Sequence, residues 1–210
     1  MRVARLITNL ITSLTSGLST GIAIVAAGVT LLATPAGAAV PETPGALASV
    51  EGDSRLSGPG VDISVAIPPG WHQVADPAHP QLLQMAYPDT CTAGLSCASA
   101  LARVISAQAP SAQNGAQTAE QGIASQPGIQ GATITSQGPV QIAGRNGYAV
   151  RFSFTTTKGH FQAETAALET GPAADGKVPV SLIFVAVSDL PGAPPATVID
   201  EIMSSAQLAR

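Results

Sequence analysis

The 210-residue sequence contains little charge and few aromatic residues. Charged residues make up 10% of the chain and aromatic residues 3%, and Lys and Arg together number only nine. No segment gathers these basic residues into a cluster. Clusters of that kind bind nucleic acids and anionic membranes, so we expect neither kind of partner. The sequence also lacks a recognisable catalytic or cofactor motif, so no catalytic, cofactor-binding or metal-ligating residue is predicted.

The first 38 residues have the three parts of a secretory signal peptide. Arg2 and Arg5 are the only charges in the first 41 residues, and residues 21–33 form an apolar run. A small-x-small motif then ends at Ala38, which predicts cleavage between Ala38 and Ala39. Removal of this segment leaves seven basic and thirteen acidic residues, a net charge of about −6 before any His contribution.

An uncleaved membrane anchor is the alternative interpretation of this segment. Residues 6–33 carry no charge and are long enough to cross a bilayer core of about 30 Å. The first half is rich in Thr, Ser and Asn, which favours the cleaved signal. No cysteine lies near the predicted cleavage site, so no acceptor for a lipid anchor is present there. We therefore expect a product that is secreted, in the extracellular space or associated with the cell wall.

The only two cysteines, Cys91 and Cys97, enclose five residues. Exported thiols meet an oxidising compartment, so this even pair predicts a disulfide that closes a small loop. In the loop-entropy model such a ring contributes about 2 kcal/mol. A thioredoxin-like redox motif needs C-x-x-C, and a zinc site needs two further ligands in the window, so both alternatives fit less well.

Residues 39–60 are rich in Pro, Gly and small polar residues, which predicts a flexible linker. A single domain over residues 61–210 follows. Its hydrophobic periodicity predicts a mainly antiparallel sheet flanked by helices, the α+β class. A tight hairpin turn is expected at residues 144–147. Strands are expected at 61–67, 100–107, 132–142, 148–154, 161–168 and 178–187, a strand or helical turn at 82–87, and helices at 116–125 and after Pro194-Pro195.

The loop that follows the first strand holds Trp71, His72, Asp76 and His79. Two imidazoles and a carboxylate can ligate zinc, but this spacing matches no known geometry and prolines interrupt the segment. We interpret the two His and the Asp as solvated loop residues. Trp71, His72 and His79 are retained as candidates for a binding surface, although a lone Trp after a strand favours a plug at the edge of the core.

Three further sets of polar residues are interpreted as having no catalytic role. Ser96 lies in a segment that faintly resembles a nucleophile elbow, but it sits between the two cysteines and Ala98 stands where a glycine is expected. Glu164 and Glu169 are five residues apart on one strand, so they point to opposite faces of the sheet and cannot pair as acid and base. His160 lies in a turn between strands, where we expect it to be exposed.

The order of several segments resembles a known fold. The strand that ends in Pro68-Pro69-Gly70-Trp71 is followed by the 140–144 turn segment, the 148–154 strand, the 181–187 strand and the closing 198–205 helix. This order resembles the Mog1/PsbP-like fold and, within it, the actinobacterial LpqN/LpqT family of exported lipoproteins. The resemblance covers most of residues 61–210 and implies an α/β sandwich, no known catalytic residues and a non-enzymatic role in the envelope. The absent lipid-acceptor cysteine departs from that family.

These observations favour an exported, non-catalytic protein that binds a protein partner in or outside the cell envelope. A carrier of a small apolar ligand or lipid is the main alternative, because the composition is rich in Ala and weakly charged. A hydrolase that uses His72 and His79 is a further alternative.

Overall fold

The computed structural model describes residues 54–76, 79, 81–90 and 98–209. The predicted signal peptide with its cleavage site, residues 39–53 of the linker, and the segment with Ser96 and both cysteines lie outside the described residues. In chain order the elements are β1 (Arg55–Leu56), β2 (Ile63–Ala66), β3 (His72–Gln73), β4 (Leu83–Tyr87), β5 (Ala100–Ala109), α2 (Ala112–Ala124), β6 (Gln130–Ile142), β7 (Arg145–Thr156), β8 (Gly159–Glu169), β9 (Val178–Ser188), α3 (Val198–Ser204) and β10 (Gln207–Leu208).

The strands form two sheets. Seven of them lie in the order β3-β4-β5-β9-β8-β7-β6, and β1 and β10 flank β2 in a second, three-stranded sheet. Every strand pairing is antiparallel. The predicted α+β class, with a mainly antiparallel sheet flanked by helices, is confirmed.

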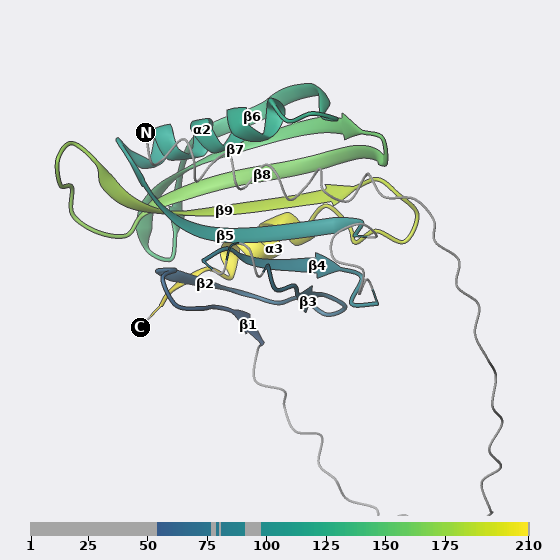
Figure 1. Ribbon diagram of the computed structural model, residues 1–210, viewed down its shortest axis with the longest axis horizontal. Coiled ribbons are helices and arrows are strands. Elements are labelled where there is room, and N and C mark those ends of the chain that lie inside the picture. Colours follow the sequence, from purple (N-terminus) through teal and green to yellow (C-terminus); the bar gives the residue numbers. More distant parts are fainter. Residues whose placement is uncertain (1–53, 77–78, 80, 91–97, 210) are drawn as a thin grey trace, which may run out of the picture. The chain divides into compact units, whose positions relative to one another are not determined.

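Strand β9 lies in the middle of the large sheet, between β5 and β8 (Figure 1). Its sequence is almost entirely apolar, and every residue from Val180 to Ser188 is buried. Side chains on a strand alternate between the two faces, so β9 supplies both hydrophobic cores. Each buried Val, Leu, Ile or Phe contributes about 1.5–3 kcal/mol. One core contains Val180, Leu182, Phe184 and Ala186, and the other contains Ile183, Val185 and Val187.

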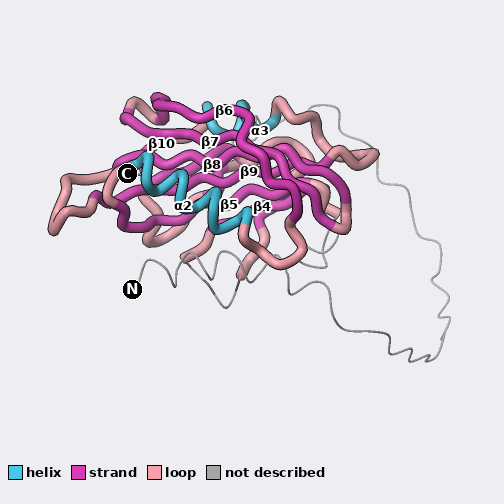
Figure 2. Tube along the Cα trace, turned by 90° about the horizontal axis from the view of Figure 1, so that it is seen from above, coloured by secondary structure: helices cyan, strands magenta, loops and turns pink. Residues whose placement is uncertain are grey.

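A different layer covers each face of the large sheet. Helix α2 packs on one face over β5, β7, β8 and β9 (Figure 2). Helix α3 and the small sheet pack on the other face, where Ile63 and Val65 of β2 and Ile199 and Ile202 of α3 join the core. The two faces are called the α2 face and the α3 face below.

Helix α2 begins at Ala112, four residues before the predicted start. The hydroxyl of Ser111 accepts a hydrogen bond from the backbone N–H of Asn114 at 3.1 Å, which caps the first turn. Gly115 faces the sheet, and a Cβ there would lie 3.5 Å from side chains of Ala109, Ala167 and Val180. The small residues therefore let the helix approach the sheet closely.

The hairpin between β6 and β7 turns two residues earlier than predicted. Ile142 pairs with Arg145, so the two loop residues are Ala143 and Gly144, with φ values of 52° and 72°. Two positive φ values are typical of the type I′ turn, whose twist suits a hairpin. Asn146 and Gly147 lie within β7 instead.

The predicted linker extends too far toward the domain. Leu56 is fully buried and pairs with Val65 of β2, so β1 belongs to the folded domain. The Arg55 guanidinium donates hydrogen bonds to the backbone oxygens of Ser64 and Ser205, at 3.0 and 2.6 Å. Sequence periodicity misses β1 because two residues are too few to show a pattern.

The C-terminal helix is also shorter than predicted. Helix α3 begins at Val198, three residues after Pro195, and the chain continues into β10. Gln207 and Leu208 pair with Ser64 and Ile63 at the edge of β2. The small sheet is thus formed by segments from both ends of the domain.

Candidate functional site

The loop with the histidine candidates follows β3 on the α2 face. His72 pairs with Ala86 of β4, and the backbone N–H of Val74 donates to the Gln84 oxygen at 2.9 Å. The structure brings Asp76 and His79 together, with 3.0 Å between Oδ2 and Nδ1. His72 does not join this pair. Its Nδ1 is buried and has no hydrogen-bond partner among the residues that the structure describes.

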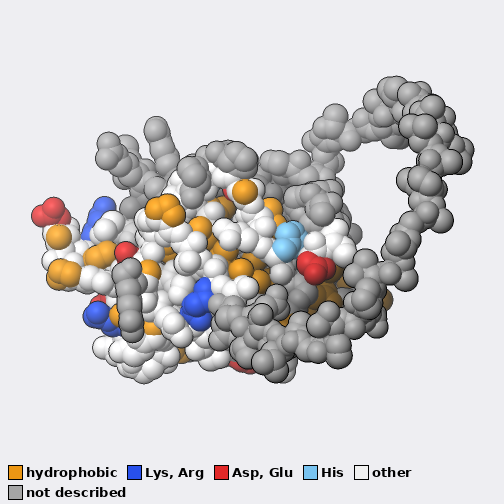
Figure 3. All heavy atoms as spheres, turned by 90° about the horizontal axis from the view of Figure 1, so that it is seen from below, with side chains coloured by type: hydrophobic (Ala, Val, Ile, Leu, Met, Phe, Trp, Pro, Cys, Tyr) orange, Lys and Arg blue, Asp and Glu red, His pale blue; other side chains and the backbone are white. Residues whose placement is uncertain are grey.

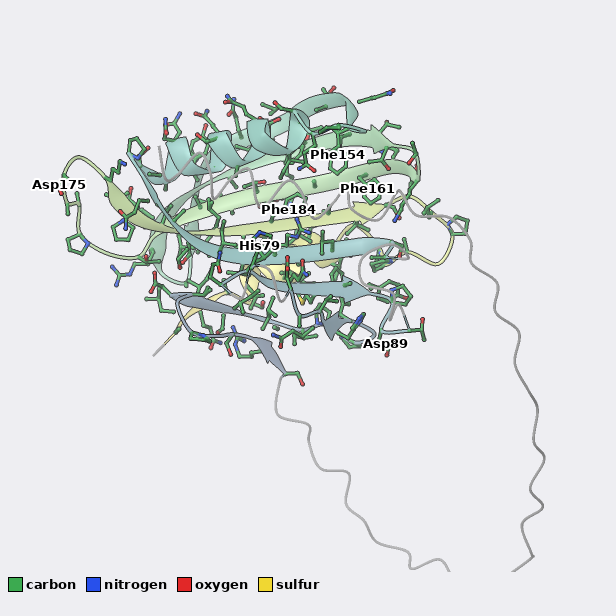
Figure 4. All side chains as sticks on the ribbon, viewed as in Figure 1. His79, Asp89, Phe154, Phe161, Asp175 and Phe184 are labelled. Atoms are coloured by element: carbon green, nitrogen blue, oxygen red, sulfur yellow. The ribbon has the colours of Figure 1, made fainter. Side chains whose placement is uncertain are left out.

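A buried arginine faces this loop. Arg103 of β5 is 1% exposed, and its Nε donates to Oε1 of Gln84 at 3.3 Å. Burial lowers the pKa of Arg103 to about 10, while the charge of Asp76 acts in the opposite direction. His79 lies in front of β5 in Figure 4, near the same region of the sheet. The polar groups of this cluster therefore satisfy one another, as buried charges require.

This pairing also determines what the cluster can do chemically. Asp76 is held by His79 on one side and lies in the field of Arg103 on the other. An arginine next to a carboxylate disfavours the approach of a divalent cation. Within 54–76, 79, 81–90 and 98–209, no group of three or more His, Cys, Asp or Glu side chains could hold a metal ion.

Trp71 is buried just before the start of β3. It is 6% exposed, and its ring centroid lies 6.1 Å from that of Tyr87. Trp71 belongs to the core on the α3 face, and the half-buried Tyr87 packs against that core. This position is the one expected of a plug at the edge of the core, and a binding role for Trp71 stays a prediction of the sequence.

Glu164 and Glu169 lie on opposite faces of β8, as alternation predicts. Glu164 is buried on the α3 face and accepts a hydrogen bond from Nε of Arg151. A second nitrogen of Arg151 donates to Asp200 of α3. These hydrogen bonds raise the pKa of Arg151, the one to Glu164 most. The ion pairs link α3 to the sheet, and Glu169 Oε1 accepts from the N–H of Ala112 at the start of α2 at 3.4 Å.

A depression that sequence reasoning missed lies where β8 begins and β9 ends. Its volume is about 270 Å³. Its polar wall includes His160, Gln162 and Asp189, and its apolar wall includes Leu190 and Pro194. His160 is exposed, as predicted. A sequence signal exists, since Asp189 and Leu190 directly follow an apolar strand and precede a Pro- and Gly-rich loop, but the depression forms only when that loop folds back toward β8.

One face of the molecule shows how the basic side chains are distributed. On the face drawn in Figure 3, Lys and Arg side chains lie at separate positions and form no patch. Neither helix in the described part of the chain is both long and apolar enough to cross a membrane.

Comparison with known proteins finds similarity at the level of solved structures. No family model and no curated protein sequence matches the chain. The solution structure of cyanobacterial PsbP (CyanoP) from Synechocystis sp. PCC 6803 aligns over 79% of this chain and 99% of its own, with 15% identity and a TM-score of 0.47. LpqN, described as involved in cell envelope biogenesis of Mycobacterium tuberculosis, aligns over 76% of this chain and 91% of its own, with 11% identity and a TM-score of 0.44.

A third similar structure comes from Bacteroides thetaiotaomicron VPI-5482. It aligns over 77% of this chain with 12% identity and a TM-score of 0.46. The aligned part is 50% of that protein, so the chain spans about half the length of this relative. The fold assignment rests on the sheets and helices described above, and membership of the LpqN/LpqT family stays a prediction from the order of segments.

Proposed function

We propose that the chain is an exported, non-catalytic protein that binds a protein partner in the envelope or outside the cell. The N-terminal signal supports export. The observation that carries the binding function is the open depression between β8, β9 and the 190–196 loop. It is a concave site on the surface, with polar and apolar walls. None of the ion-paired residues described above lines it.

The buried polar groups support a structural interpretation of the remaining chemistry. The Asp76–His79 pair and the charge of Arg103 hold these two loop residues near β5. The Arg151 pairs hold α3 against β7 and β8. Neither set contains a hydroxyl or thiol nucleophile with an adjacent base.

The size of the depression favours a protein partner over a carried ligand. Small-molecule sites typically enclose about 300–1,000 Å³ and are mostly apolar. The depression here holds about 270 Å³ and has His160, Gln162 and Asp189 in its wall. A site of this size and polarity suits one side chain of a partner. A carrier of an apolar ligand or lipid is the second interpretation of the sequence.

Native mass spectrometry of the protein secreted by an exporting host tests this proposal. The proposal expects the mass of the polypeptide alone, and a stoichiometric complex with one protein from envelope fractions that reforms from the two purified components. Extra mass that disappears on denaturation would instead identify a carrier. Activity on any substrate that is lost in the His72→Ala/His79→Ala double variant would support the hydrolase.

A further inference from the structure

The depression has a fixed carboxylate in its wall. The backbone N–H of His160 donates to Oδ1 of Asp189 at 3.3 Å, and the N–H of Asp189 donates to the His160 oxygen at 3.0 Å. Gly159 lies beside the carboxylate, because a Cβ there would come within 3.1 Å of Asp189 Oδ1. Position 159 thus leaves room for the carboxylate, and the extended β8–β9 pairing holds its backbone in place.

The apolar part of the wall belongs to the loop before α3, and Leu190 lies on the same side as the carboxylate, since a Cβ at Gly159 would also come within 3.5 Å of its side chain. The N–H of Ala193 donates to the Leu190 oxygen at 3.0 Å, which closes a turn. This loop leaves the end of β9 and returns to α3 in Figure 1. Leu190 is 38% exposed, and it is one of two large hydrophobic residues that are exposed in the described part of the chain. An exposed Leu in the wall of a depression offers apolar area to a partner.

The charges at the depression and over the mature chain favour a cationic ligand. The ion pairs found among the described residues are His79–Asp76, Arg151–Glu164 and Arg151–Asp200, so none of them neutralises Asp189. The predicted mature chain is also acidic, with seven basic and thirteen acidic residues. A negative domain with a carboxylate in a depression attracts a cationic group and increases its rate of encounter.

The hydrogen bonding of the carboxylate distinguishes between cationic side chains. Arg binds a carboxylate best through two parallel hydrogen bonds, which need both oxygens. Oδ1 of Asp189 already accepts the N–H of His160. A Lys ammonium needs a single oxygen, and its aliphatic stem covers apolar surface while the charge stays near water.

We propose that the depression lined by Asp189, Leu190 and Pro194 binds a lysine side chain of the protein partner, with the ammonium at Asp189 and the stem against Leu190. The inference rests on the proposed partner-binding function and names the chemistry of its contact. It identifies Asp189 as the residue that determines specificity for a cation, and Leu190 as the apolar contact.

A titration with blocked lysine tests this site directly. The secreted, ¹⁵N-labelled protein is titrated with Nα-acetyl-lysine N-methylamide, and the amide shifts of His160, Asp189 and Leu190 are followed by NMR. Saturable shifts at these residues are expected. Nα-acetyl-norleucine N-methylamide has the same stem without the charge, and it should bind about two- to fivefold more weakly, as expected for an exposed charge pair.

Two matched variants locate the charge. Asp189→Asn keeps an oxygen for the His160 N–H and removes the charge, so it should weaken lysine binding about two- to fivefold without changing norleucine binding. Asp175→Asn removes another exposed acid from the turn at the opposite end of β9 (Figure 4), and it should bind like the wild type. Leu190→Ser should weaken the binding of both probes.

Two outcomes would overturn the inference. One is equal binding of the lysine and norleucine probes, and the other is lysine binding that Asp189→Asn leaves unchanged. The dispersion of the amide spectrum verifies that each variant is folded. If the probes fail while the native protein still forms its complex with an envelope protein, the lysine site is wrong and the proposed function stands. If no complex forms at all, the proposed function fails independently of the probes.

Discussion

Arg103 and Gln84 lie directly opposite each other on neighbouring strands, and the arginine Nε donates to the glutamine Oε1 at 3.3 Å. The same guanidinium lies in the field of Asp76, and only 1% of the Arg103 surface is exposed. A buried cation of this kind persists only when its partners remain in place. The positions of Asp76 and Gln84 therefore depend on one side chain of β5.

We expect Arg103→Met to destabilise the domain by about 3–5 kcal/mol. The substitution removes the cation and leaves Asp76 and Gln84 without it on the α2 face, which is the costly way to break a buried pair. Urea unfolding followed by far-UV circular dichroism measures the difference. Arg145→Met is the matched control, since Arg145 is exposed at the β6–β7 hairpin and should change stability by about 0.5 kcal/mol or less. Equal effects of the two variants would show that the cluster has no special role.

The three charges that link α3 to the sheet should contribute unequally. Arg151→Leu leaves the buried carboxylate of Glu164 without its cation and should cost about 1–3 kcal/mol, less than a fully buried pair because Arg151 is 41% exposed. Asp200→Asn removes a partner that is 63% exposed and should cost about 0.5 kcal/mol or less. Denaturant midpoints of both variants test this order, and a larger loss for Asp200→Asn would contradict it.

The β6–β7 turn allows backbone strain to be measured without side-chain clashes. Gly144 has a φ of 72°, and a Cβ there would meet nothing within 4 Å. Gly144→Ala should therefore lower stability by about 1–2 kcal/mol through conformation alone. The neighbouring Ala143 already has a φ of 52°, so Ala143→Gly should raise stability by about 0.5–1 kcal/mol. Thermal unfolding of the two variants should shift in opposite directions, and shifts in the same direction would argue against a type I′ turn.

The disulfide between Cys91 and Cys97 stays a prediction of the sequence. Mass spectrometry after alkylation of the unfolded, unreduced secreted protein should find no free thiol. Cys91→Ser should lower stability by about 2 kcal/mol, the contribution of a short ring in the loop-entropy model, and should leave partner binding intact. Selective loss of binding in a stable variant would indicate that the loop contacts the partner.

The sequence predicts the parts of the fold that local periodicity determines. Alternation along Tyr148, Val150, Phe152 and Phe154 identifies β7, and the apolar run of β9 identifies a strand covered on both faces. The burial of Arg103 is not predicted from the sequence, because Arg103 lies on β5 and Asp76 lies in a loop far from it in the chain. Periodicity alone predicts that a charged residue is exposed to solvent. The predicted hairpin turn is misplaced by two residues because Asn and Gly normally occupy positive φ, whereas here Ala143 and Gly144 do so.

The candidate site is less predictable for a related reason. The residue types of the histidine loop suggest a binding site, yet in the structure Asp76 and His79 pair with each other. The depression near Asp189 depends on contacts between β8, β9 and the loop before α3. Those contacts arise from backbone hydrogen bonds between the ends of strands, such as the one between His160 and Asp189, and no short sequence motif predicts them.

Glu120 on α2 offers a test of how burial of a carboxylate changes stability with pH. It is 7% exposed, and desolvation raises its pKa in the folded state above the ordinary value of 4.5. The folded state then binds the proton more tightly than the unfolded state, so ionisation of Glu120 destabilises the fold. The loss is absent below the unfolded pKa, grows as the pH rises from 4.5 through the raised pKa, and remains constant above it. Glu120→Gln removes this loss with little change in helix propensity. We therefore expect the variant to melt at a higher temperature than the wild type at pH 7 and at the same temperature below pH 4.5, whereas a difference that does not depend on pH would show that packing, rather than charge, determines the stability at this position.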